Sequence, residues 1–227
     1  MKSIDINVDV GEGFGYDRQL MSIATSANIC CGAHSGDVEL SKATASMAKD
    51  LHVRIGAHPG LPDRSTMGRG PMPELHTTNR AALFMELRDQ CLRLIEWGAV
   101  YVKFHGTLYN AAANNQDVCG LVTDVMAVAQ LPLMGLPGTL HESAAKTAGV
   151  PFIREGFADR SYDERGQLLP RGSAGAVLVN EEQIVAGAGN LVSRVDSICV
   201  HGDTPGCVAL AQALRKSLES QGYEVKA

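Results

Sequence analysis

The stretch Ala27-Asn28-Ile29-Cys30-Cys31-Gly32-Ala33-His34-Ser35-Gly36-Asp37 shows the unit from which this chain is built. It opens on a short, mostly apolar run, which predicts a buried β-strand. A glycine-rich turn with a histidine and an aspartate follows, and an amphipathic segment starts at Glu39. The same succession of strand, polar turn and helix returns along the chain, which is typical of parallel strands joined by crossover helices.

Extending this unit in both directions predicts the remaining elements. Seven apolar runs are expected to be strands: Ile4–Val10, Ala27–Cys31, Val53–Ala57, Val100–Phe104, Leu131–Leu136, Phe152–Arg154 and Ser197–Val200. Six amphipathic segments are expected to be helices: Glu39–Leu51, Ala81–Trp97, Asp117–Gln130, Leu140–Ala148, Glu181–Val192 and Val208–Ser220. The expected fold is α/β, an irregular seven-stranded (β/α) TIM-like barrel, with residues 1–227 as a single domain. An open doubly wound sheet is the alternative.

The composition excludes several classes of protein. The 227 residues are 45% hydrophobic and carry a net charge of −5, which allows a large core but not the clustered basic surface of a nucleic-acid-binding protein. No segment is long and apolar enough to span a membrane, and the N-terminus does not resemble a signal peptide, which indicates a cytoplasmic protein. The six cysteines form no Cys-x-x-Cys pair and are expected to be free and buried.

Two nucleotide-binding motifs are missing from the sequence. Val10-Gly11-Glu12-Gly13-Phe14-Gly15 lacks the glycine spacing of a dinucleotide-binding turn, and no helix-like segment opens on it. There is also no Gly-x-x-x-x-Gly-Lys-Ser/Thr phosphate loop. If the reaction uses ATP, this chain does not bind its phosphates through a loop of that type.

The residues that can carry chemistry follow the predicted strands. Four of the seven histidines come shortly after a strand and close to a glycine: His34, His58, His105 and His201. Three carboxylates near strand ends join them as candidate catalytic groups: Asp9, Asp37 and Asp203. Because the carboxyl ends of parallel strands meet on one face, these side chains are expected to form a ring there. Histidine transfers protons near neutral pH, so we interpret the ring as catalytic.

Other polar residues near the same strand ends are candidate substrate contacts: Asn28, Asp63, Arg69, Lys103 and Tyr109. Lys103 lies two positions before His105, so both side chains are expected to face the barrel interior, where a lysine can bind a carboxylate or phosphate. Arg69, between two glycines, can clamp an anion or lie on the surface. The remaining histidines are expected to be structural: His52, His76 and His141.

A metal site is a second interpretation of the histidine ring. Histidine and aspartate side chains from several strand ends resemble the ligand sets of metal-assisted hydrolases. No short ligand pair such as His-x-x-x-His is present, and the candidates are far apart in the chain. The sequence therefore leaves open whether a metal binds.

Six motifs, in order along the chain, resemble the family of 5-oxoprolinase A subunits, also called the lactam-utilisation proteins. The motifs are Asp5-Ile6-Asn7-Val8-Asp9-Val10-Gly11-Glu12, residues 26–37, Gly56-Ala57-His58-Pro59-Gly60, Lys103-Phe104-His105-Gly106-Thr107-Leu108-Tyr109-Asn110, Phe157-Ala158-Asp159-Arg160-Ser161-Tyr162 and Cys199-Val200-His201-Gly202-Asp203-Thr204-Pro205. The similarity runs from the first strand to the last helix.

The resemblance implies a barrel related to polysaccharide deacetylases and the ATP-dependent opening of 5-oxoproline (pyroglutamate) to L-glutamate. It also implies that ATP is used by an assembled enzyme with two partner subunits, B and C, acting on a small lactam. In our hypothesis ATP phosphorylates the lactam oxygen with help from the partners, and the His/Asp ring directs hydrolysis by stabilising the charged tetrahedral species. No nucleic-acid or membrane partner is expected, and self-association is left open.

The chain departs from the family pattern at residues that bear on substrate shape: Ala33, Ser35, Met67 and Phe104. A related lactam or cyclic amide therefore stays open as the substrate. Two other functions also stay open. One is a metal-dependent deacetylase or amidohydrolase that acts alone, and the other is a non-catalytic subunit that presents substrate to its partners.

Overall fold

The computed structural model describes residues 2–164, 166–169 and 171–227, and within these residues seven parallel strands close into a barrel. The strands follow one another around it in chain order: β1 (Lys2–Val10), β2 (Ser26–Cys30), β3 (Arg54–His58), β4 (Tyr101–Val102), β5 (Leu133–Gly135), β6 (Phe152–Phe157) and β7 (Ser197–Val200). β1 closes the barrel by pairing with both β2 and β7. The expected TIM-like barrel is confirmed, and the open doubly wound sheet is wrong.

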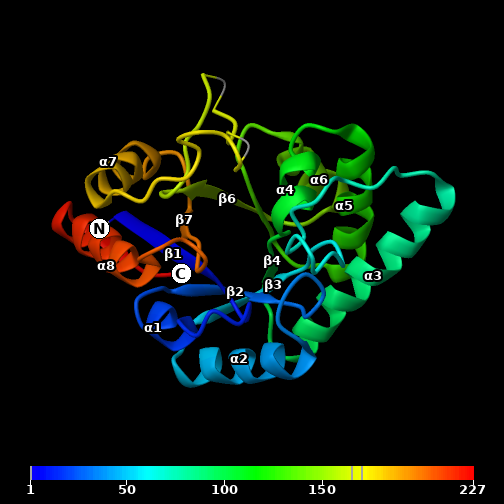
Figure 1. The fold of residues 1–227 in the computed structure, drawn as a ribbon, viewed down its shortest axis with the longest axis horizontal. Helices are drawn as coiled ribbons and strands as arrows, with labels where there is room; N and C mark the ends of the chain where they lie inside the picture. Colours follow the sequence, from blue (N-terminus) through cyan, green and yellow to red (C-terminus); the bar gives the residue numbers. More distant parts are fainter. Residues whose placement is uncertain (1, 165, 170) are drawn as a thin grey trace.

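Helices cover the outside of this barrel (Figure 1). They are α1 (Asp17–Met21), α2 (Val38–Asp50), α3 (Thr77–Glu96), α4 (Gly106–Ala112), α5 (Gln116–Ala129), α6 (Leu140–Ala148), α7 (Glu181–Leu191) and α8 (Cys207–Ser220). The six expected helices are present. The sequence does not predict α1, α4 or the strand β8 (Tyr223–Val225), because each is too short to show a clear periodic pattern. None of the described helices is long and apolar enough to cross a membrane.

Each strand has an apolar outer face and an inner face that is largely polar, which β1 shows most clearly. Its aliphatic residues, at positions 4, 6, 8 and 10, belong to the apolar core between barrel and helices. The alternate residues Asp5, Asn7 and Asp9 are buried and form hydrogen bonds across the barrel interior. The period of two in a strand separates the two sets. All six cysteines are buried and free, as expected.

Polar side chains pair in layers inside the barrel. In the lowest layer the Asp5 carboxylate accepts hydrogen bonds from Ser26 (2.7 Å), Ser197 (2.5 Å) and Arg54 (3.0 Å). In the next layer Asn28 donates to Asn7 and Asp9, at 2.7 Å each, and accepts from Tyr101 at 2.6 Å. The interior of a TIM barrel is usually filled with branched apolar side chains. Here it forms a hydrogen-bonded column that leads up to the carboxyl ends of the strands.

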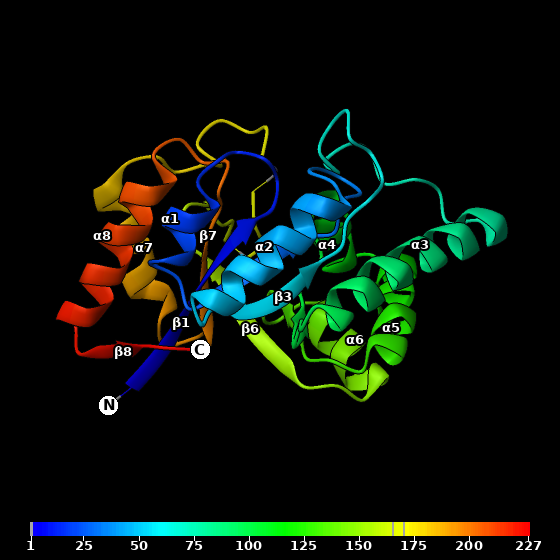
Figure 2. The same cartoon turned by 90° about the horizontal axis from the view of Figure 1, so that it is seen from below.

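The loops after β1, β3 and β6 rise at one end of the barrel, away from the two chain termini (Figure 2). The loop between β6 and α7 pairs with itself, through bridges between Arg160 and Val177 and between Tyr162 and Leu168. We call this end the mouth of the barrel. It is the end where ligands bind in barrels of this kind.

Candidate active site

A cavity of about 680 Å³ opens at the mouth. Its lining includes buried residues that follow or end the strands, which we call the floor: Asp9, His58, Lys103, His105 and His201. It also includes three arginines from the surrounding loops: Arg69, Arg160 and Arg171. The cavity therefore combines a floor rich in titratable groups with cationic walls.

His201, directly after β7, is held by Asp159, which follows β6. Its Nδ1 lies 2.9 and 3.0 Å from the two Asp159 oxygens, and Asp159 also accepts from the Thr204 hydroxyl at 2.7 Å. Burial alone would raise the pKa of Asp159, but His201 and these hydrogen bonds hold it below its ordinary value. The carboxylate therefore fixes the proton on Nδ1, and Nε2 is left bare, 4.0 Å from Asp9 Oδ2. This is the arrangement of a general base and its positioning group.

Lys103 lies in the centre of the barrel between two carboxylates. Its Nζ is 2.9 Å from Asp9 Oδ1 and 2.7 Å from Glu155 Oε1. Burial opposes the charge of Lys103, but Asp9, Cys199 and Glu155 outweigh it and raise its pKa well above the ordinary value. Burial also opposes the charge of Asp9, yet Lys103 and the neighbouring histidines hold the pKa of Asp9 well below its ordinary value. Lys103 thus neutralises buried carboxylates under the cavity.

His58 and His105 face each other on the other side of the floor. His58 Nδ1 lies 2.7 Å from the Lys103 carbonyl oxygen, and His105 Nε2 lies 2.8 Å from the Met67 carbonyl oxygen. A carbonyl oxygen only accepts, so these two nitrogens carry the protons. The other two nitrogens, His58 Nε2 and His105 Nδ1, are 2.9 Å apart. Burial lowers the pKa of His58 to about 3 and lowers that of His105 well below its ordinary value, so both rings are neutral.

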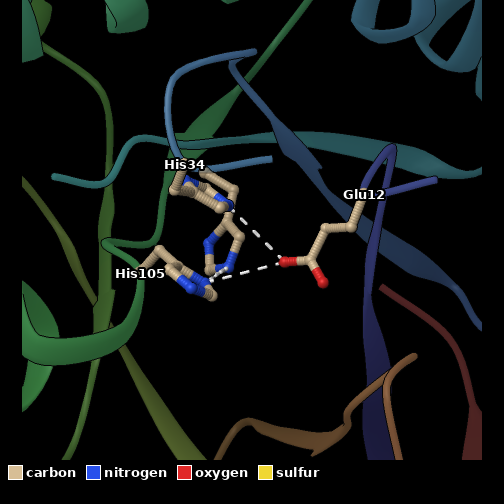
Figure 3. Close-up of side chains that lie close together, drawn as sticks. Glu12, His34 and His105 are labelled. Carbon is tan, nitrogen blue, oxygen red and sulfur yellow. Dashed lines mark hydrogen bonds and ion pairs between the residues drawn. The ribbon is translucent and has the colours of Figure 1, made fainter. Parts of the chain in front are cut away.

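His34 and Glu12 complete this side of the floor (Figure 3). The ring of His34 is stacked on that of His105, with ring centres 3.9 Å apart and planes 2° from parallel. Glu12 Oε1 lies 3.5 Å from His34 Nε2 and 3.7 Å from His105 Nδ1. Burial opposes a charge on His34, but Cys30 and Glu12 raise its pKa to about 9. With His58, these residues form a group that could hold a metal ion.

Eight of the predicted site residues lie at the floor or directly beneath it: Asp9, Asn28, His34, His58, Lys103, His105, Tyr109 and His201. Asn28 holds Asp9 from below. Tyr109 is buried, and its hydroxyl lies beside the Glu155 carboxylate. His141 is also buried and bonded to backbone groups on both ring nitrogens, as expected of a structural histidine.

Three predicted carboxylates lie elsewhere. Asp37 caps α2, where its side chain accepts from the Leu40 N–H at 2.7 Å. Asp63 is exposed and accepts from hydroxyls of its own loop. Asp203 lies at the mouth, where it pairs with Arg69 at 2.9 Å and Arg171 at 2.7 Å. Proximity in sequence to a strand end is not enough to place these side chains on the floor, because each loop turns its carboxylate toward a nearer donor.

Other residues of the site are not among the predicted ones: Glu12, Glu155, Asp159, Arg160 and Arg171. Glu12 and Asp159 follow β1 and β6 in the same way that the histidines follow their strands, so the same rule could have found them. Glu155 lies inside β6, where nothing in the sequence shows which face it takes. Arg171 reaches the cavity only because the loop after β6 folds back over the mouth.

Comparisons with known proteins agree with this geometry. Residues 4–227 match the model of the LamB/YcsF family. The chain is 38% identical over 247 residues to a 5-oxoprolinase A subunit from Streptomyces avermitilis, with 99% of each chain covered. It is 38% identical over 250 residues to the protein of the same name from Neisseria meningitidis serogroup C, with 100% of each covered.

Two solved structures extend these comparisons to the fold. The lactam utilization protein from Thermus thermophilus has a TM-score of 0.86 and 32% identity, and the match covers 100% of both chains. A peptidoglycan deacetylase from Bacillus subtilis has a TM-score of 0.51 and 13% identity, over 99% of this chain and 87% of the other. The second likeness concerns the fold alone, and it confirms the expected relation of the barrel to deacetylases.

Proposed function

This chain belongs to the LamB/YcsF family, and on that premise we propose that it is the hydrolytic subunit of a 5-oxoprolinase, which opens 5-oxoproline to L-glutamate. The names of its relatives support the substrate and a multi-subunit enzyme. We extend the proposal to partner subunits B and C and to coupling with ATP. The observation that carries the proposal is the His201–Asp159 pair, whose bare nitrogen stands beside Asp9 in a cavity with cationic walls.

The walls of the cavity suit a small anionic lactam. Arg69 and Arg171 are held at the mouth by Asp203, with side chains 23% and 25% exposed. A guanidinium group binds a carboxylate in a defined, often bidentate orientation. The carboxylate of 5-oxoproline would bind there, and its amide ring would point toward the floor. A volume of about 680 Å³ leaves room for the ring and for water.

The proposed reaction adds water to the lactam carbonyl carbon and breaks the ring C–N bond. His201 Nε2 takes a proton from the attacking water and returns it to the leaving nitrogen, which becomes the amine of glutamate. The carbonyl carbon becomes the side-chain carboxylate. The Lys103 ammonium supplies positive charge near the developing oxyanion. ATP would activate the carbonyl by placing its γ-phosphoryl group on the lactam oxygen, and it would leave as ADP and phosphate after hydrolysis.

The test uses the full assembly with subunits B and C, ATP and 5-oxoproline, and measures glutamate release. Asp159→Asn is expected to lower kcat by about 10²- to 10⁴-fold, because the amide no longer fixes the Nδ1 proton of His201. KM should change little, since Asp159 lies behind His201. Asp63→Asn, at an exposed carboxylate, is the matched control. Unchanged kcat in Asp159→Asn, with KM alone raised in His201→Gln, would instead indicate a non-catalytic binding subunit.

A second candidate is a metal-dependent deacetylase or amidohydrolase that acts alone. The cluster of Glu12, His34, His58 and His105 favours it. This function predicts hydrolysis of amides by the isolated chain, without ATP, and inhibition by a chelator. Glutamate release that strictly requires ATP and the partner subunits would eliminate it.

A further inference from the structure

We propose that Glu12, His34, His58 and His105 form a binding site for one divalent transition-metal ion of the Zn²⁺ type. The first observation is the contact between His58 Nε2 and His105 Nδ1, which are 2.9 Å apart. Because both rings donate their protons to backbone carbonyls on the far side, both facing nitrogens present lone pairs. Two lone pairs repel each other at this distance, and a cation bound to both removes the repulsion.

The second observation is the set of unpartnered polar atoms around this contact. Among the described residues, Glu12 Oε1 and both ring nitrogens of His34 are buried and form no hydrogen bond. The side chains of His34 and Glu12 are 0% and 3% exposed, so bulk water does not compensate. Buried polar atoms are nearly always paired, and an unpaired group calls for a specific partner. An ion between these atoms supplies one.

The distances suit a single ion. One donor atom from each of the four side chains lies within 4.8 Å of the other three. Donors bound to one Zn²⁺ at about 2.0–2.2 Å are roughly 3–4 Å apart. The separations of 2.9, 3.5 and 3.7 Å around Glu12 and His105 fall close to this range. His34 is stacked parallel to His105, so its ring must tilt for its lone pair to reach the same ion.

The surroundings resemble those of metal-binding histidines. Such a histidine usually donates its second N–H to a carbonyl or carboxylate, which fixes the ring and bares the ligating nitrogen. The Lys103 and Met67 carbonyls do this for His58 and His105. A set of imidazoles with one carboxylate suits Zn²⁺, Co²⁺ or Ni²⁺ rather than Ca²⁺ or Mg²⁺, which prefer oxygen ligands.

The experiment measures metal binding to the full chain. The purified protein is stripped with a chelator and titrated with Zn²⁺ by calorimetry, with metal content determined by mass spectrometry, and a Co²⁺ sample is examined by visible absorption. We expect one ion per chain and the absorption bands of tetrahedral Co²⁺. Glu12→Gln and His105→Gln are expected to weaken binding at least about 100-fold, since each removes a direct ligand.

His141→Gln is the matched control, because it replaces a buried histidine outside the cluster and should bind metal like the unaltered chain. Circular dichroism checks that each variant is folded, and the two ligand variants are independent of each other. A folded chain that binds none of Zn²⁺, Co²⁺, Ni²⁺ and Mn²⁺ at micromolar concentration overturns the proposal. So does binding that both ligand variants retain, or histidine NMR spectra that show an imidazolium at His34 or His105 persisting in excess metal.

The site shares its cavity with the proposed function, but the two can fail separately. Metal binding is measured without lactam, ATP or partner subunits. The proposed hydrolysis is measured through Asp159 and His201, which lie on the other side of the floor.

Discussion

At the scale of single residues, the main chain determines the chemistry of the buried histidines. The carbonyl of Lys103 fixes the proton of His58, and the carbonyl of Met67 fixes that of His105. Met67 has φ +53°, a left-handed conformation that is uncommon for residues other than glycine. A strained backbone at a functional site persists only where its surroundings hold it. Here the strain turns a carbonyl toward a catalytic ring.

Gly68, the next residue, tests how tightly the stacked rings are held. Gly68 has φ +67°, and a Cβ there would lie 3.0 Å from the Cβ of His34 and 3.1 Å from the Cδ2 of His105. Gly68→Ala is therefore expected to displace both rings and to lower kcat at least about 10-fold, since small displacements of catalytic groups reduce rates strongly. Glutamate release by the assembled enzyme measures the effect.

Gly149→Ala separates this displacement from the cost of the backbone conformation. Gly149 has φ +73° and nothing within 4 Å of an added Cβ. Its replacement should reduce the free energy of unfolding by about 1 kcal/mol and leave kcat unchanged. If the two variants had equal kcat, the rings would not be tightly held.

At the scale of elements, the apolar runs predict the seven barrel strands, but not which polar residues lie inside the barrel. β6 extends to Phe157, beyond the predicted end at Arg154, because Glu155 and its neighbours interrupt the apolar run. The strand-end rule finds His58, His105 and His201, since each directly follows a strand or ends one. It fails for Arg171, whose position depends on how a long loop folds. The floor of the site is thus largely predictable, and its walls are not.

Asp37 shows the same limit at the start of a helix. It lies near the end of β2 in the sequence, which suggests a place in the ring. It also stands directly before an amphipathic segment, which is the pattern of an N-cap. The structure shows the second role, with the carboxylate on the Leu40 N–H.

Asp37→Ala should therefore lower stability and leave catalysis intact. Loss of the cap is expected to reduce the free energy of unfolding by about 1 kcal/mol. Asp37→Ser keeps a capping oxygen and should recover most of it. Urea unfolding and glutamate release, measured on both variants, check the prediction. A fall in kcat of Asp37→Ala beyond about 10-fold, with stability unchanged, would return Asp37 to the catalytic groups.

At the scale of the whole molecule, neutral buried histidines make the fold sensitive to acid. The pKa of His58 is lowered to about 3 and that of His141 to about 4, in both cases mainly by burial. The unfolded chain takes up protons at these histidines near pH 6.5, whereas the folded chain does not. Their contribution to stability is therefore complete above about pH 6.5 and is lost as the pH falls toward 4 and 3.

His141→Gln isolates one such contribution. Nδ1 of His141 accepts the Leu136 N–H at 3.1 Å, a bond that protonation would break, and Nε2 donates to the Tyr109 carbonyl at 3.0 Å. Between pH 7 and pH 4.5 the unaltered chain is expected to lose about 2–3 kcal/mol more stability than the variant. Urea unfolding at the two pH values measures this. His76→Gln, at an exposed histidine, is the control, and parallel losses in all three proteins would refute the account.

The closure of the barrel through β1 has a consequence for the newly made chain. One edge of β1 pairs with β2, which follows soon after it, but the other edge waits for β7 and β8, at residues 197–200 and 223–225. At roughly 5–20 residues per second, the ribosome needs about 10–40 s to reach them. During that time the first strand offers an unpaired edge to any neighbouring chain. A translation product that stops short of β7 keeps that edge open.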